Sequence, residues 1–152
     1  MLFDYLFCMI QRIQSLYLSI AALISLGLVF VFPLWENADG LAYFMGNLFA
    51  DSQLTVKAIA ILFMVSGVLS LVSVFLYKNR KNQFVTNRLN ILINLILLGL
   101  LIYHLLMVSG GTQVPEKGIG SVLPIIVIVL LALANRAIKK DEDLVKSVDR
   151  LR

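Results

Sequence analysis

The sequence predicts an all-α integral membrane protein, a four-helix bundle that forms a single domain over residues 1–152. Three observations carry this prediction: a high apolar content, four long uncharged runs, and cations gathered beside those runs. The 152 residues are 60% hydrophobic and only 14% charged, whereas a soluble domain is about half apolar and roughly one quarter charged. A soluble fold needs a wettable surface, so the apolar excess indicates an outer surface that faces lipid.

Four runs between charged residues contain 23, 20, 27 and 18 residues without Asp, Glu, Lys or Arg. A helix needs roughly 20 residues, each rising about 1.5 Å, to cross about 30 Å of hydrocarbon. The runs are continuously apolar rather than alternating, which favours helices over barrel strands. Pro124 falls in the first turn of the last expected span, where its missing N–H costs little. The expected spans are residues 15–35, 56–77, 87–107 and 121–137, followed by a helical tail over residues 138–152.

Orientation follows from the cations. Eleven of the 13 Lys and Arg residues flank the first span, lie in the 78–88 connection or lie in the tail, whereas only Lys57 and Lys117 lie on the opposite side. By the positive-inside rule, the N-terminus, the middle connection and the C-terminus are expected in the cytoplasm. The expected interfacial aromatic belt comprises Trp35, Tyr43 and Tyr103 outside and Tyr77 inside.

The stretch MIQRIQSLYL begins at Met9 with a clean start to the first span. We expect Met9 to be the natural start and Met1–Cys8 to be an artefact of the assigned start; the alternative is a short interfacial segment.

Cys8 is the only cysteine, which excludes an internal disulfide and a cysteine-based metal cage. The first span is too long for a signal-peptide core and no small-x-small cleavage site follows it, so it should stay attached.

Two outer connections differ in character. In residues 36–55, apolar residues recur at spacings of 3 and 4. This pattern fits a short amphipathic helix on the outer leaflet, capped by Asp39, and fits equally an irregular loop folded over the bundle. Residues 109–120 hold four glycines and Pro115, typical of a flexible turn. The apolar residues of the first connection are Leu41, Phe44, Met45, Leu48 and Phe49.

The tail carries a narrow apolar stripe and two i,i+4 pairs of opposite charge, which support a helix. The stripe can pack on the middle connection or bind a partner, but an exposed continuation near anionic headgroups is the simpler expectation. The stripe is Leu144, Val145, Val148 and Leu151, and the pairs are Lys139/Asp143 and Glu142/Lys146.

Polar side chains within the spans offer little chemistry. No Asp or Glu occurs between Ser52 and Pro115, and no cofactor motif is present. His104 is the only histidine, and without a nearby acid or cysteine it is a poor metal ligand and a poor catalytic base, so an interfacial hydrogen-bonding role is expected. We therefore predict no catalytic residue, no metal, no cofactor and no enzymatic activity.

One polar cluster is expected near the inner face. Asn87, Asn90 and Asn94 share one helix face because they are spaced by 3 and 4 residues. The simpler interpretation is that these amides tie the bundle together; the functional one is an interaction site for a headgroup, a peptide or a partner. We call the full set the candidate interaction rim: Gln11, Arg12, Gln14, Asn87, Arg88, Asn90, Asn94, Asn135 and Arg136.

Pairs of small residues at i,i+4 permit close helix packing, within the bundle or between copies. They are Ser15/Ser19, Ala21/Ser25 and Ser66/Ser70, the last with Gly67 beside it.

The segments MIQRIQSLYL (9–18), FPLW (32–35), FLYKNRK (75–81), RLNILINL (88–95) and LANRAIKKDEDLVKSVDRLR (133–152) resemble domain-of-unknown-function family 4293. This family comprises short four-helix membrane proteins of Bacteroidota, and the resemblance covers the chain from Met9 onward; Met1–Cys8 departs from the pattern. The resemblance implies the inner membrane of a Gram-negative bacterium. It implies no activity, substrate or catalytic residue.

Three functions remain in competition. The first is a non-enzymatic accessory or scaffold subunit of the inner membrane, with a polar and basic cytoplasmic surface. The second is a small oligomeric transporter or channel, because four helices rarely enclose a pathway alone. The third is a membrane enzyme acting on lipids. It is the weakest, because general acid–base chemistry needs a positioned pair of residues.

Expected partners are the lipid bilayer and a membrane protein or further copies of the chain. Nucleic acid is not expected, because the cations flank apolar runs rather than forming one basic face.

Overall fold

A computed structural model describes residues 13–36, 41–108 and 118–150. The expectations for Met1–Cys8, Asp39 and most of the 109–120 connection lie outside these residues. Helices dominate the described part of the chain. In chain order the elements are α2 (Ile13–Leu23), the π-helix η1 (Ile24–Leu28), α3 (Val29–Val31), β1 (Trp35–Glu36), β2 (Ala42–Tyr43), α4 (Met45–Ala50), α5 (Leu54–Phe75), the 3-10 turn η2 (Leu76–Lys78), α6 (Arg80–Val108), the 3-10 turn η3 (Ile119–Val122) and α7 (Leu123–Arg150).

Four helical segments among the described residues are long and apolar enough to cross a membrane, which confirms the predicted fold class. They lie side by side with alternating directions: α5 packs against α2 and α6, and α7 packs against the same two helices. The four segments are Ile13–Val31, Leu54–Lys78, Arg80–Met107 and Ile119–Asp143.

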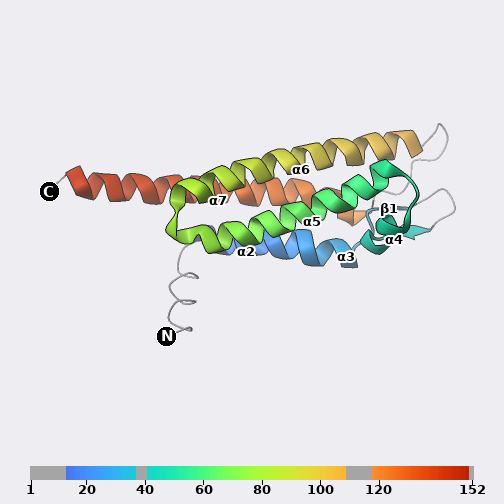
Figure 1. The fold of residues 1–152 in the computed structure, drawn as a ribbon, viewed down its shortest axis with the longest axis horizontal. Helices are drawn as coiled ribbons and strands as arrows, with labels where there is room; N and C mark the ends of the chain where they lie inside the picture. The colour runs from blue at the N-terminus through green and yellow to red at the C-terminus, as the bar shows by residue number, and fades with distance from the viewer. Residues whose placement is uncertain (1–12, 37–40, 109–117, 151–152) are drawn as a thin grey trace.

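The two ends of the bundle differ (Figure 1). At one end α2 begins, η2 connects α5 to α6, and α7 runs on past the other helices. We call this the η2 end. At the other end lie β1, β2 and α4, and we call this the α4 end.

Several boundaries differ from those expected. The first helical segment ends at Val31 rather than at residue 35, because Pro33 forces Phe32 into an extended conformation (φ −97°, ψ 136°). Helix α6 begins at Arg80 rather than at residue 87, so only Asn79 separates it from η2. Charged residues limit the stretch that can lie in lipid without limiting the helix itself. For the same reason α7 continues to Arg150, as the predicted helical tail requires.

The core of the bundle is apolar. Leu18, Val29, Phe63, Leu97 and Leu131 are fully buried between the helices. Large apolar side chains also cover the outside, where they are exposed. An apolar core with an apolar exterior is the distribution expected of helices that face lipid. Outward-facing examples are Phe75, Leu92, Leu106 and Val129.

Helix α5 approaches the π-helical segment η1 closely. A Cβ placed on Gly67 would collide with the side chain of Leu26. On an adjoining face of α5, Ser66 and Ser70 are buried toward α6. Small residues on α5 therefore serve close packing within the bundle.

The α4 end is closed by the first outer connection. Strands β1 and β2 pair antiparallel with Trp35 opposite Tyr43, and the Leu34 N–H donates to the Tyr43 carbonyl at 2.8 Å. Helix α4 has only six residues, and two of them, Met45 and Leu48, are fully buried. The connection thus folds over the bundle with a short helix inside it, which combines parts of the two expected alternatives. No side chain caps α4, whose N-cap residue is Phe44.

Trp35 does not belong to an interfacial belt. Its side chain is buried, with the Tyr43 ring stacked on it at a centroid distance of 5.7 Å and the His104 ring at 4.6 Å. The expectation for Trp35 was wrong because β1 turns the ring into the bundle. Tyr103, in contrast, is exposed on the outer surface of α6.

Two glycines hold η3 against the turn that follows α3. The Gly120 N–H donates to the Pro33 carbonyl at 2.9 Å. A Cβ on Gly118 would collide with the Pro33 carbonyl oxygen and would lie 2.7 Å from the carbonyl carbon of Leu34. This backbone contact fixes the start of α7 relative to the end of the first span.

Candidate functional site

Two polar stripes face each other between α5 and α6. All members of both stripes are fully buried, and in each stripe they recur every three or four residues, so each stripe occupies one helix face. We call the two stripes together the polar ladder. It consists of Ser66, Ser70 and Ser73 on α5 and of Gln83, Asn87, Asn90 and Asn94 on α6.

The part of the polar ladder nearest the η2 end is joined by two contacts. The Ser73 hydroxyl donates to Asn87 Oδ1 at 2.6 Å, and Gln83 Nε2 donates to the Ser73 carbonyl at 3.0 Å. Both contacts join residues close to the α5–α6 connection. They therefore fix the angle at which the chain reverses direction at Asn79.

Deeper in the bundle the asparagines bond to serines. Asn90 Nδ2 donates to Ser70 Oγ at 2.8 Å and to the Ser66 carbonyl at 3.0 Å. Asn94 Nδ2 lies 2.7 Å from Ser66 Oγ and 3.0 Å from Asn90 Oδ1. Hydrogen bonds between helices in lipid contribute about 0.6 to 2 kcal/mol each. The polar ladder therefore ties α5 to α6.

The polar ladder ends near the middle of α6. Asn94 lies 14 residues after Arg80, about 21 Å along a helix that rises about 1.5 Å per residue. On the same face, the next side chains toward the α4 end are Leu97 and Leu101, both buried in the apolar core. The polar ladder is thus confined to the half of the bundle nearer the η2 end.

The candidate interaction rim divides into two groups. Gln14, Asn87, Asn90 and Asn94 are buried and Asn135 is partly buried. Arg88 and Arg136 are exposed, and Gln11 and Arg12 lie outside the described residues. The described amides thus point into the protein, whereas the described cations point outward, because neighbouring positions on a helix face different directions.

Ser73 and Gln83 were missed by sequence reasoning. Their signal is present in the sequence: residues 66, 70 and 73 and residues 83, 87, 90 and 94 form two matching polar patterns on consecutive helices. Two polar stripes of the same period, separated by a single connection, predict helices that face each other. This match can be recognised only when both stripes are assigned to helices. The expected start of the helix at residue 87 placed Gln83 in a loop instead.

Some buried polar atoms make no hydrogen bond with the described residues. Examples are both side-chain polar atoms of Gln14, Asn87 Nδ2 and Asn94 Oδ1. These groups are neutral amides, and no group of three or more His, Cys, Asp or Glu side chains among the described residues can hold a metal ion. The described polar interior can bind by hydrogen bonding.

At the η2 end, the cations lie on and around α7. Arg136, Lys139 and Lys140 are exposed, and with Asp143 and Ser147 they line a shallow hollow. Arg80 Nη1 lies 3.3 Å from the Asp141 carbonyl and so joins α6 to this part of α7. The predicted pair Glu142–Lys146 is present at 2.8 Å. On α6, the Arg88 guanidinium lies over the Phe84 ring at 4.5 Å.

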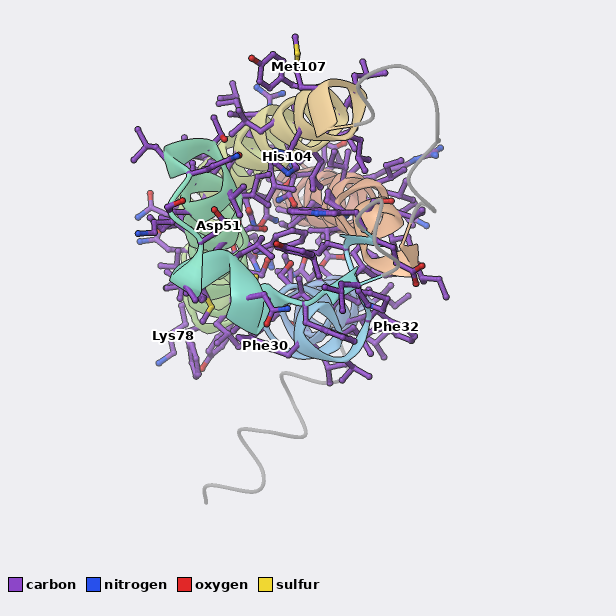
Figure 2. The ribbon with its side chains drawn as sticks, turned by 90° about the vertical axis from the view of Figure 1, so that its right-hand side faces the viewer. Phe30, Phe32, Asp51, Lys78, His104 and Met107 are labelled. Carbon is purple, nitrogen blue, oxygen red and sulfur yellow. The ribbon has the colours of Figure 1, made fainter. Side chains whose placement is uncertain are left out.

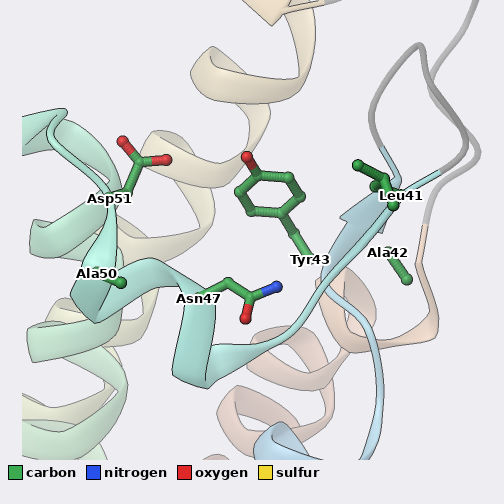
Figure 3. A pocket seen from close by; sticks show the side chains of 6 residues that line it. All are labelled: Leu41, Ala42, Tyr43, Asn47, Ala50 and Asp51. Atoms are coloured by element: carbon green, nitrogen blue, oxygen red, sulfur yellow. The ribbon is translucent and has the colours of Figure 1, made fainter.

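A second hollow, of about 380 Å³, lies at the α4 end. Figure 2 views the bundle from this end and labels Asp51 and His104, and Figure 3 shows the hollow itself. The sequence predicted a short amphipathic helix or an irregular loop here and no binding site, although Tyr43, Asn47 and Asp51 are spaced by four residues. We call it the α4 hollow; it is lined by Leu41, Ala42, Tyr43, Asn47, Ala50 and Asp51.

Four apolar helices, an apolar exterior and an uncharged polar interior define a four-helix integral membrane protein. The family model for "Domain of unknown function (DUF4293)" matches residues 10–151. The chain therefore belongs to this family, as the sequence motifs indicated. Searches of the curated proteins and of the solved structures found no match.

Proposed function

We propose that this chain is a non-enzymatic accessory or scaffold subunit of a bacterial inner membrane, with the η2 end in the cytoplasm. In this proposal the bundle anchors the protein and the polar ladder stabilises it. The part of α7 beyond Ala134, with its exposed cations, binds an acidic surface of a membrane-protein partner. The single observation that carries the proposal is the extension of α7 past the other helices (Figure 1).

Length and charge support this role for α7. Its 28 residues extend about 42 Å, whereas the hydrocarbon layer is about 30 Å thick. The excess length carries Arg136, Lys139 and Lys140 at exposed positions. Such a surface attracts acidic partners and sets the orientation of binding more than its affinity.

The partner-binding role is tested by reversing charge on α7. Replacing Arg136, Lys139 and Lys140 together with Glu is expected to lower native co-purification of the partner at least tenfold in mild detergent. The matched control keeps the charges with Arg136→Lys, Lys139→Arg and Lys140→Arg, and should retain the partner. Quantitative mass spectrometry of the purified complexes measures both. No reproducible partner for the unaltered chain, or equal recovery with the Glu variant, would contradict the proposal.

The orientation is tested separately by cysteine labelling. In a Cys8→Ser background, Gln53→Cys at the α4 end is expected to react with a membrane-impermeant maleimide in intact spheroplasts. Lys140→Cys at the η2 end is expected to react only after the membrane is permeabilised. Both positions are exposed in the fold, so accessibility differs only through the membrane. The opposite labelling pattern would reverse the assignment.

The alternative function, a small oligomeric transporter or channel, has less support. The polar ladder ends at Asn94, and Leu97 and Leu101 follow it in the core. A continuous polar path would have to form between several copies. Solute flux into liposomes above that of empty vesicles, lost when the copies are separated, would favour this alternative.

A further inference from the structure

We propose that the α4 hollow binds a primary alkylammonium group. The hollow is lined by both polar and apolar side chains from β2, α4 and the residue that follows α4. Its volume of about 380 Å³ lies at the lower end of the range of small-molecule sites, about 300 to 1,000 Å³. The proposal concerns the opposite end of the bundle from the partner-binding surface and does not depend on it.

The acceptors in the α4 hollow match the donors of an ammonium group. Tyr43 contributes a hydroxyl oxygen, Asn47 an amide oxygen and Asp51 a carboxylate; in Figure 3 the Asp51 carboxylate lies on the hydroxyl side of the Tyr43 ring, and the Asn47 amide lies at the other end of that ring. A primary ammonium carries three N–H donors and no acceptor. The Asp51 carboxylate can therefore balance its charge and accept its N–H groups together with the Tyr43 hydroxyl oxygen, while Asn47 lines the far side of the hollow.

Asp51 is available to a cationic ligand. Its Oδ1 accepts the N–H of Gln53 at 2.9 Å, which holds the carboxylate in place and leaves Oδ2 for another donor. Within residues 13–36, 41–108 and 118–150, no Lys or Arg forms an ion pair with Asp51. Among the described residues that line the hollow, it is also the only charged side chain.

The remaining lining favours an alkylammonium over a metal ion. Leu41, Ala42 and Ala50 offer an apolar surface that fits the methylene groups next to the nitrogen. The Tyr43 ring can add a cation–π contact. A divalent metal prefers several carboxylates or other strong ligands, and the hollow provides one carboxylate. Ethanolamine, free or as a phospholipid headgroup, combines a primary ammonium with a short apolar chain.

The fold supplies its own reporter of binding. Trp35 is the only tryptophan of the chain, and its ring stacks on that of Tyr43, which lines the hollow. A ligand that contacts Tyr43 should change the fluorescence of Trp35. No label has to be introduced.

The test titrates ethanolamine hydrochloride into the purified full chain in neutral detergent and follows Trp35 fluorescence, with KCl at equal ionic strength as reference. A saturable change is expected with ethanolamine alone. Asp51→Asn should weaken the apparent Kd at least tenfold, although the new side chain can still accept the Gln53 N–H. Glu36→Gln removes a nearby carboxylate that does not line the hollow, and should change the Kd less than twofold.

Two further arms identify the source of the ammonium group. Nanodiscs of phosphatidylethanolamine and of phosphatidylglycerol are compared by the same fluorescence. A shift of Trp35 fluorescence that occurs only in phosphatidylethanolamine nanodiscs, and that is lost in Asp51→Asn, assigns the site to a lipid headgroup. Equal spectra in both kinds of nanodisc, together with saturation by ethanolamine in detergent, assign the site to a free amine. The proposal is overturned if neither ethanolamine nor phosphatidylethanolamine gives a specific change. It is equally overturned if a folded Asp51→Asn variant, with an unchanged melting temperature, binds like the unaltered chain.

Discussion

Replacing Asn90 with Leu is expected to lower the free energy of unfolding by about 2 kcal/mol, because two interhelical hydrogen bonds of about 0.6 to 2 kcal/mol each are lost. Asn90 Nδ2 donates to the Ser66 carbonyl and to Ser70 Oγ, and Asn90 Oδ1 accepts from Asn94. Leu has a similar size, so the change removes polar contacts without opening a large cavity. Unfolding in mixed micelles, followed by far-ultraviolet circular dichroism, measures the difference.

Two controls separate the polar ladder from general packing. Leu92→Ala alters an outward-facing residue of the same helix and should change stability by less than about 0.5 kcal/mol. Combining Asn90→Leu with Ser70→Ala should show a coupling of about 0.5 to 1 kcal/mol, since residues in contact are not additive. An Asn90→Leu variant as stable as the unaltered chain would show that the polar ladder does not stabilise the fold.

Replacing Gly118 with Ala is the second change expected to have a large effect, a loss of about 1 to 3 kcal/mol from overpacking. The added Cβ would collide with the Pro33 carbonyl oxygen and crowd the backbone of Leu34. Backbone atoms cannot rotate away as a side chain can. The start of α7 must therefore separate from the turn that follows α3. Unfolding free energy measures the cost, and Trp35 fluorescence reports the displacement next to Leu34.

Gly99→Ala provides the matched control. This glycine lies in α6, and a Cβ there meets no atom within 4 Å. Ala is the better helix former by up to about 1 kcal/mol, so this variant should be as stable as the unaltered chain or more stable. If Gly118→Ala and Gly99→Ala have the same stability, the contact with Pro33 does not restrain α7.

The helices could be predicted from the sequence because hydropathy and length directly determine what can lie in lipid. The ends of the helices could not be predicted in the same way. Hydropathy identifies the part of a helix that faces lipid, but it does not show where the backbone hydrogen bonding of the helix begins and ends. Residues 80–86 show this difference: the uncharged run starts only after Arg88, and yet the helix begins at Arg80. The first span also ends earlier than its apolar run, because Pro33 forces Phe32 out of the helical conformation.

The candidate site was predicted in part. The shared face of Asn87, Asn90 and Asn94 follows from spacing alone, and the structure buries all three. Their partners on α5 depend on which helices are neighbours, which spacing within one helix does not determine. The α4 hollow depends on the pairing of β1 with β2, because that pairing places Tyr43 beside α4. Two strands of two residues each leave too short a pattern to be recognised in a sequence.

The pairing of α5 with α6 bears on how the chain enters the bilayer during synthesis. Taken alone, α6 would expose Gln83, Asn87, Asn90 and Asn94 to hydrocarbon, where an unsatisfied polar group costs about 1 to 3 kcal/mol. Paired with α5 through a connection of one residue and a 3-10 turn, these amides bond to serines instead. The two helices should therefore leave the translocon together as a hairpin, with α5, which is synthesised first, retained beside the channel until α6 is there to pair with it.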